Sequence, residues 1–120
     1  MANLEAQINK ILTEFAEEVH TQTDEIGLKL AKAGARQINS NAKVFNGSRY
    51  SRSWTTTTEK ARTGNTFVIH SKIPGLPHLL ENGHASRNGG RVSGRPHIQP
   101  VEEELIKKYQ EEVIDVIQGR

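Results

Sequence analysis

The sequence predicts one α+β domain, made of a long N-terminal helix, an antiparallel β-hairpin or small sheet, a short helix, a basic loop and a C-terminal helix. Three observations predict this class. Apolar residues recur at helical spacing near both ends of the chain, two β-branched runs flank a turn, and glycine, proline and arginine gather in residues 84–98. A chain of 120 residues has room for a single hydrophobic core, so one domain is expected to span residues 1–120.

The first helix is predicted from an apolar stripe that stays in phase for about eight turns. Its members are Leu4, Ile8, Ile11, Leu12, Phe15, Val19, Ile26, Leu30 and Ala33. Asn3 is the expected N-cap, and Glu5 suits the positive end of the helix dipole. Thr21, Thr23 and Gly27 weaken the middle, which leaves a kink or break open. An unbroken helix of roughly 50 Å would outrun a compact domain of roughly 35 Å, and its overhanging stripe favours a homo-oligomer.

The middle of the chain predicts a loop followed by a hairpin. Residues 39–50 are rich in turn formers and indicate a loop. Residues 53–58 and 66–71 are rich in β-branched and aromatic residues, and Thr63, Gly64 and Asn65 between them supply turn chemistry. Two strands alone are marginally stable, so this hairpin is expected to pack on the helices.

The last third predicts two more helices around a basic loop. Residues 77–82 indicate a short helix with Gly83 as its C′ residue. Residues 84–98 hold three arginines, three glycines and no acid, which favours a long basic loop. Pro100 is placed to begin the final helix, and three glutamates follow it in the first turn.

The composition limits the class of protein. Cysteine is absent, which excludes disulfides, thiolate metal sites and cysteine nucleophiles and suits a protein made in a reducing cytoplasm. No apolar run approaches the roughly 18–20 residues of a membrane helix, and the N-terminus lacks the pattern of a secretory signal. We therefore expect no contact with a membrane.

The net charge of +2 conceals an uneven distribution. Residues 1–25 carry one lysine and six acids, a net −5, whereas residues 26–98 carry twelve Lys or Arg and two acids, a net +10. Residues 99–120 return to a net −3. A basic middle of this kind fits contact with nucleic acid, or pairing with the acidic ends within one chain or between subunits. Charge alone leaves these alternatives open.

No motif indicates catalysis. His78, Glu81 and His84 are spaced by three residues, unlike the i, i+4 histidine pair of a zinc protease. Asn82, His84 and Asn88 have residue types found in histidine nucleases, but no acidic cluster accompanies them to hold magnesium. No nucleophile turn or phosphate-binding loop is present either. We therefore expect no enzyme, no cofactor, no metal and no small-molecule substrate.

The candidate interaction residues lie in the last third of the chain. Arg87, Arg91 and Arg95 in the basic loop are expected to touch either the DNA backbone or an acidic neighbouring subunit. Leu79 and Leu80 are expected to anchor the short helix to the hairpin. Glu81 is expected to pair with a basic residue.

Three motifs then carry a resemblance to a known family. They are residues 47–54, the run His78-Leu79-Leu80-Glu81-Asn82-Gly83-His84 after Pro77, and Arg95-Pro96-His97-Ile98-Gln99-Pro100 after a glycine-rich basic stretch. Together they resemble a siphophage family of small neck or tail-component proteins, encoded between the head-closure and major tail genes of tailed phages and related prophages. The resemblance covers about residues 40–105, and this chain departs from it at Arg49-Tyr50 and at Val101.

The resemblance implies a structural virion protein that acts in head–tail joining or tail completion by protein–protein assembly. The implied partners are phage head-completion or connector proteins, tail proteins and further copies of the chain, with non-specific contact with phage DNA. The implied location is the neck or tail of the virion, after assembly in the host bacterial cytoplasm. The alternative function, from the basic middle of the chain, is a small DNA-binding protein.

Overall fold

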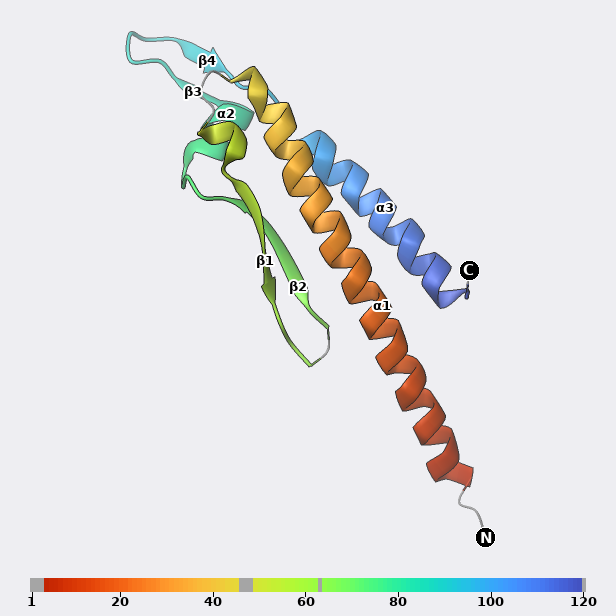
Figure 1. Ribbon diagram of the computed structural model, residues 1–120. Helices are drawn as coiled ribbons and strands as arrows, with labels where there is room; N and C mark the ends of the chain where they lie inside the picture. Colours follow the sequence, from red (N-terminus) through yellow and green to blue (C-terminus); the bar gives the residue numbers. More distant parts are fainter. Residues whose placement is uncertain (1–3, 46–48, 63, 120) are drawn as a thin grey trace.

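Figure 1 shows a computed structural model of the chain, which describes residues 4–45, 49–62 and 64–119. Asn3, Gly47, Ser48 and Thr63, which enter the predictions above, lie outside the described residues. The described part contains three α-helices and two small antiparallel sheets, so the predicted α+β class is confirmed. The molecule is a rod of 82 × 25 × 23 Å, and its long axis follows the first helix.

Helix α1 (Leu4–Asn41) is continuous through the segment where a kink had remained open. The hydroxyls of Thr21 and Thr23 donate to backbone carbonyls one turn earlier in the same helix, at 3.0 and 3.1 Å. Gly27 is required by packing, because a Cβ there would lie 2.6 Å from Cε2 of Phe67. With 38 residues, α1 is about 57 Å long.

Helix α3 (Gln99–Ile117) runs antiparallel to α1 and covers only the C-terminal half of it (Figure 1). Its 19 residues make it half as long as α1. The two helices approach closely at Gly34, where a Cβ would lie 2.4 Å from Cδ1 of Leu105. An ion pair of 2.7 Å between Lys29 and Glu112 joins them further along.

The predicted hairpin is present as β1 (Trp54–Glu59) and β2 (Thr66–Ser71), paired from Trp54 opposite Ser71 to Glu59 opposite Thr66. It packs along α1 beside α3. Asn39 of α1 closes a two-way contact with Trp54, donating to its carbonyl at 3.1 Å and accepting from its N–H at 3.0 Å. At the other end, Asp24 accepts from the N–H of Asn65 at 3.0 Å. Both ends of the hairpin are thus fixed to one helix.

The predicted basic loop is partly wrong, because it contains a second hairpin. Helix α2 (Leu76–Asn82) leads directly into β3 (Gly83–Ala85), which pairs with β4 (Arg91–Ser93). Gly89 and Gly90 form its turn at positive φ. The predicted loop at residues 39–50 also differs, since α1 reaches Asn41 and two 3₁₀ turns follow, η1 (Ala42–Val44) and η2 (Tyr50–Arg52).

The described residues bury few large side chains. The buried apolar residues are Ala31, Ala35, Ile38, Ala42, Tyr50 and Val101. By contrast, the N-terminal half of α1 leaves a row of apolar side chains between 47% and 68% exposed. We call this row the N-terminal stripe: Leu4, Ile8, Ile11, Leu12 and Phe15. Among the described helices, none is both long and apolar enough to cross a membrane.

Candidate functional site

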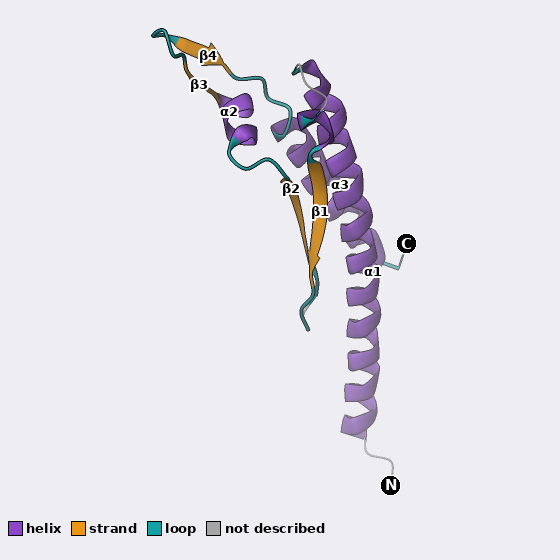
Figure 2. Cartoon of the chain, turned by 60° about the vertical axis from the view of Figure 1, so that its left-hand side comes forward, coloured by secondary structure: helices purple, strands orange, loops and turns teal. Residues whose placement is uncertain are grey.

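The α2–β3–β4 unit stands out from the side of the rod at the end farthest from the N-terminus, as Figures 1 and 2 both show. The six candidate interaction residues lie in this unit or directly after it: Leu79, Leu80, Glu81, Arg87, Arg91 and Arg95. The structure gives these residues two different tasks. Glu81 turns into the molecule, whereas most of the others face outward.

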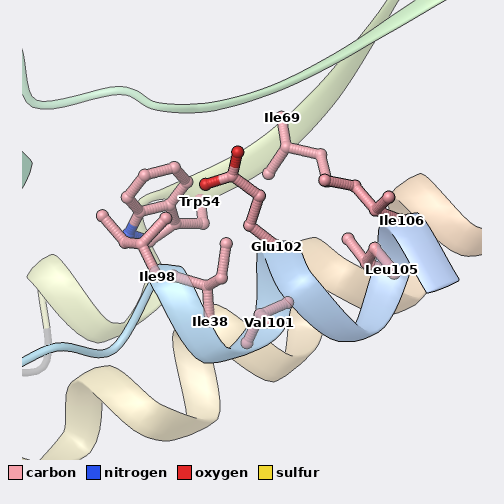
Figure 3. A pocket seen from close by; sticks show the side chains of 8 residues that line it. All are labelled: Ile38, Trp54, Ile69, Ile98, Val101, Glu102, Leu105 and Ile106. Carbon is pink, nitrogen blue, oxygen red and sulfur yellow. The ribbon is translucent and has the colours of Figure 1, made fainter.

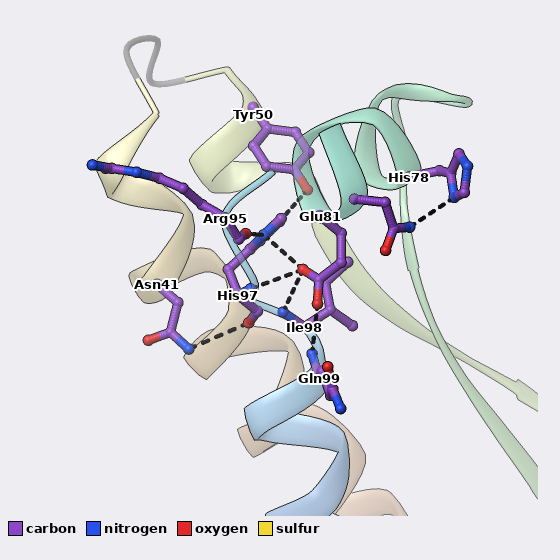
Figure 4. Close-up of polar contacts among 9 residues, drawn as sticks. Asn41, Tyr50, His78, Glu81, Arg95, His97, Ile98 and Gln99 are labelled. Carbon is purple, nitrogen blue, oxygen red and sulfur yellow. Dashed lines mark hydrogen bonds and ion pairs between the residues drawn. The ribbon is translucent and has the colours of Figure 1, made fainter. Parts of the chain in front are cut away.

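Glu81 caps the start of α3 from a neighbouring element (Figure 4). One carboxylate oxygen accepts from the backbone N–H groups of His97 and Ile98, at 2.8 and 3.0 Å, and the other accepts from Gln99 at 3.0 Å. These are N–H groups that a helix start leaves without intrahelical partners. A carboxylate is favoured there by the helix dipole. Sequence reasoning expected Glu81 to pair with a basic side chain, and its main partners are instead backbone N–H groups, with Nδ1 of His97 at 2.9 Å in addition.

His97 lies at the centre of the same network and is almost fully buried. Its Nδ1 is 2.9 Å from the carbonyl oxygen of Arg95, and because a carbonyl can only accept, Nδ1 carries a hydrogen. In the neutral ring, Nε2 therefore accepts from the hydroxyl of Tyr50 at 2.6 Å. Phe45 and Tyr50 pack edge-on against the imidazole ring, with ring centroids 4.9 and 5.6 Å away. Asn41, at the end of α1, donates to the His97 carbonyl at 3.3 Å.

The network changes the acid–base behaviour of its members. Burial raises the pKa of Glu81, but the three backbone N–H groups and the nearby His97 outweigh it and leave the pKa below the ordinary value of 4.5. Burial raises the pKa of the Tyr50 hydroxyl. Both shifts favour the protonation states in which the hydrogen bonds above exist, a carboxylate at Glu81 and a neutral hydroxyl at Tyr50.

Two glycines allow the α2–β3–β4 unit to close on itself. A Cβ at Gly83 would lie 2.4 Å from the carbonyl oxygen of Val92, and a Cβ at Gly94 would lie 2.4 Å from the carbonyl oxygen of Glu81. The obstructing atoms are backbone, which cannot move aside cheaply. The Arg95 N–H then donates to the Leu80 carbonyl at 2.8 Å and carries the chain from β4 back to α2. The sequence signal for this close approach of two backbone segments was the pair of glycines Gly83 and Gly94.

A groove with a mixed apolar and polar lining lies between this unit and the segment that follows α1. The groove has a volume of about 400 Å³. Its lining residues are Val44, Phe45, Leu79, Leu80, His84, Val92, Ser93 and Arg95. Val44, Leu79 and Val92 are exposed, and so are Arg87 and Arg91, elsewhere on the same unit. Leu79 and Leu80, expected to anchor α2 to the β1–β2 hairpin, thus line this surface, which we call the arginine groove.

The three arginines are held to different degrees. Arg91 donates from its guanidinium to the carbonyl oxygen of Asn82 at 2.8 Å, which fixes it along the edge of β3 and β4. Arg95 holds the chain through its backbone, as described above, and its side chain is exposed. Arg87 lies in the turn between the strands and is exposed as well. The unit therefore presents positive charge on its outer surface.

A second apolar pocket lies where α1, the β1–β2 hairpin and α3 meet (Figure 3). It has a volume of about 350 Å³ and an open mouth lined by Trp54, Ile69 and Ile106, with Glu102 pointing into it. Ile38 and Val101 form its floor. The pocket, which we call the seam pocket, lies between α1, the hairpin and α3, and the described side chains do not fill it.

The residues weighed for metal binding or nuclease chemistry are not brought together. His78 turns away from Glu81 and contacts the side chain of Asn82 at 3.0 Å (Figure 4). His84 contacts the carbonyl oxygen of Ala85 at 3.1 Å. Within residues 4–45, 49–62 and 64–119, no group of three or more His, Asp or Glu side chains is placed to hold a metal ion.

Comparison with protein-family models, with curated proteins and with solved structures finds no match to the chain.

Proposed function

We propose that the chain is a structural virion protein of a tailed bacteriophage that acts in head–tail joining or tail completion through protein–protein assembly. The observation that supports this most is how much apolar surface the isolated chain leaves open. The N-terminal stripe and the seam pocket are apolar and uncovered, and the arginine groove adds further exposed apolar side chains. The largest apolar patch on a protein surface is often a functional contact surface.

The contacts of Glu81 and His97 add support for the resemblance on which the proposal also rests. The two most distinctive motifs, His78–His84 and Arg95–Pro100, meet in space because the glutamate of the first caps the helix that begins in the second. Their joint occurrence thus has a structural reason. The Glu81 carboxylate and the buried His97 ring are both occupied in holding the fold, which suits a protein that assembles and does not catalyse a reaction.

In this proposal the partners are head-completion or connector proteins, tail proteins and further copies of the chain, and the location is the neck or tail of the virion. The test is deletion of the gene from the phage or prophage that encodes it, followed by electron microscopy of the lysate. We expect unattached heads and tails to accumulate, and attached particles to return when the gene is supplied on a plasmid. Attached, infectious particles in the absence of the gene would overturn the proposal.

A second candidate function is binding of duplex DNA, favoured by the exposed Arg87, Arg91 and Arg95 on one projecting unit. Three phosphate contacts would make the logarithm of the binding constant fall with the logarithm of salt concentration with a slope of roughly −3. Fluorescence anisotropy with a labelled duplex at several salt concentrations measures that slope. A steep slope that flattens in the variant R87A/R91A/R95A would favour this function, and absence of binding at low salt would exclude it.

A further inference from the structure

We propose that the N-terminal stripe of one copy docks into the arginine groove of a second copy, so that copies join head to tail. The inference rests on the proposed function in one respect, namely that the chain works as an assembly of copies. It goes further by naming both surfaces of the contact. They lie at opposite ends of a rod 82 Å long.

The N-terminal stripe is an apolar ridge with acidic flanks. Its five side chains leave about 500 Å² uncovered, if each would expose roughly 150–200 Å² when free. Residues 4–20 carry four glutamates and one lysine, a net −3. At 100° per residue, Glu5 lies roughly 80° to one side of the centre of the stripe and Glu18 roughly 60° to the other. A partner surface must therefore be apolar in the middle and basic at the edges.

The arginine groove has the complementary character. Leu79, Leu80 and Val92 give its lining apolar side chains, and Arg95 lines it too. Arg87 and Arg91 are exposed on the same projecting unit. The sole acid in residues 60–98 is Glu81, and its carboxylate is already occupied by the N–H groups that begin α3. The positive charge of the three arginines therefore has no acidic side chain of the α2–β3–β4 unit to neutralise it. An acidic ridge gains both apolar contact and charge pairing there.

The geometry favours a second copy over the two other arrangements within one sequence. Helix α1 is unbroken, so its N-terminal half cannot fold back to the groove at the other end of the same molecule. Pairing of two stripes side by side would bring the glutamates of both copies together, and like charges in contact are destabilising. Docking of stripe into groove avoids both problems.

The expected assembly follows from the asymmetry of the contact. Two different surfaces that join head to tail produce a ring if the rotation closes and a filament if it does not. The stripe offers about 500 Å², less than the roughly 800 Å² per partner of a standard specific interface, so a single pair is expected to be weak. A closed ring gains from every copy making two contacts at once.

The test uses two variants of the full chain, each disabled at one end. The stripe variant is I8Q/I11Q/F15Q, and the groove variant is L79Q/R95E. All five side chains are exposed, so the fold is expected to persist, and circular dichroism checks this. The control is I114Q/I117Q, which removes exposed apolar side chains from α3, outside both surfaces. Sedimentation velocity measures mass as a function of protein concentration.

We expect the wild type and the control to associate, and each disabled variant alone to need at least about tenfold more protein to do so. A mixture of the two variants should form a one-to-one dimer and nothing larger, because one intact stripe and one intact groove remain. Two individually monomeric proteins that combine in this way show folded, complementary surfaces.

Three outcomes would overturn the contact: a monomeric wild type at high concentration, a groove variant that associates like the wild type, or a mixture that stays monomeric. The proposed function is tested separately by gene deletion. Unattached heads and tails on deletion, together with a monomeric wild type, would reject the head-to-tail contact and retain the proposed function.

Discussion

At the scale of single residues, Glu81 accepts hydrogen bonds from three successive backbone N–H groups at the start of α3 and contacts the buried imidazole of His97. A side chain from α2 thereby binds the N-terminus of α3, which lies sixteen residues or more further along the chain. Tyr50 and Asn41 hold the same histidine from two further segments. The junction of four segments therefore depends on a small number of polar contacts.

Replacement of Glu81 by glutamine is expected to lower the free energy of unfolding by about 2 kcal/mol at pH 7, because the hydrogen bonds to the helix start lose their charged acceptor. Urea unfolding followed by circular dichroism measures the loss. Glu103→Gln is the matched control, an exposed glutamate in the first turns of α3, and should change stability by less than about 0.5 kcal/mol. Equal effects of the two substitutions would contradict the capping role.

The same substitution carries a pH dependence. The pKa of Glu81 is lowered in the folded state, so its contribution is fully present above the ordinary value of 4.5 and is lost as pH falls through the folded value. The glutamine variant lacks this dependence. The stability difference between wild type and variant should therefore shrink when unfolding is measured at about pH 3, whereas a constant difference would indicate a purely steric effect.

At the scale of elements, the β3–β4 hairpin depends on glycine for two separate reasons, a positive φ and the close approach of another backbone segment. Gly83 and Gly89 have similar positive φ values, 84° and 80°. A Cβ at Gly83 meets the backbone of Val92, whereas a Cβ at Gly89 meets nothing within 4 Å. The two positions thus share one conformational demand and differ in packing.

Gly83→Ala is expected to cost about 3 kcal/mol, from the strained φ together with the backbone clash. Gly89→Ala should cost about 1 kcal/mol, from the φ alone. Urea unfolding of the two variants in parallel measures both values. Comparable losses would mean that the close approach of β3 to β4 is unimportant for stability.

Helix α1 has two halves in different surroundings. Residues 27–38 lie against the hairpin and α3, whereas residues 4–15 have exposed side chains throughout. An isolated helical segment of this length is marginal in water. In dilute monomer we expect amide hydrogens of residues 8–15 to exchange at least about tenfold faster than those of residues 27–38, as measured by NMR. Equal protection of both halves at low concentration would contradict this account.

At the scale of the whole molecule, the shape itself is testable. The radius of gyration is 20.3 Å over the Cα atoms, whereas a compact chain of this length would have about 14 Å. Small-angle X-ray scattering from dilute protein should give a value near 20 Å with a profile typical of a rod. A value near 14 Å would mean that the first helix folds back, and would remove the basis for docking between copies.

Local sequence patterns determined the secondary structure where they were long and periodic. The apolar repeat from Leu4 to Ala33, the β-branched runs around residues 53–71 and the proline and glutamates at the start of the last helix predicted their elements, and the α+β class with them. The acidic ends and the basic middle of the chain follow directly from the sequence. These properties depend on neighbours along the chain, so the sequence carries them directly.

Only the tertiary structure decided which groups meet across the chain. Gly27 leaves room for Phe67 of the hairpin, which the sequence around Gly27 did not indicate. The β3–β4 hairpin was mistaken for a loop because its strands are short and its glycines matter through distant backbone atoms. The role of Glu81 depends on N–H groups at least sixteen residues away, which no local pattern can place. The physical reason is that packing and hydrogen bonding between distant segments are set by the folded arrangement and are not encoded by residue spacing.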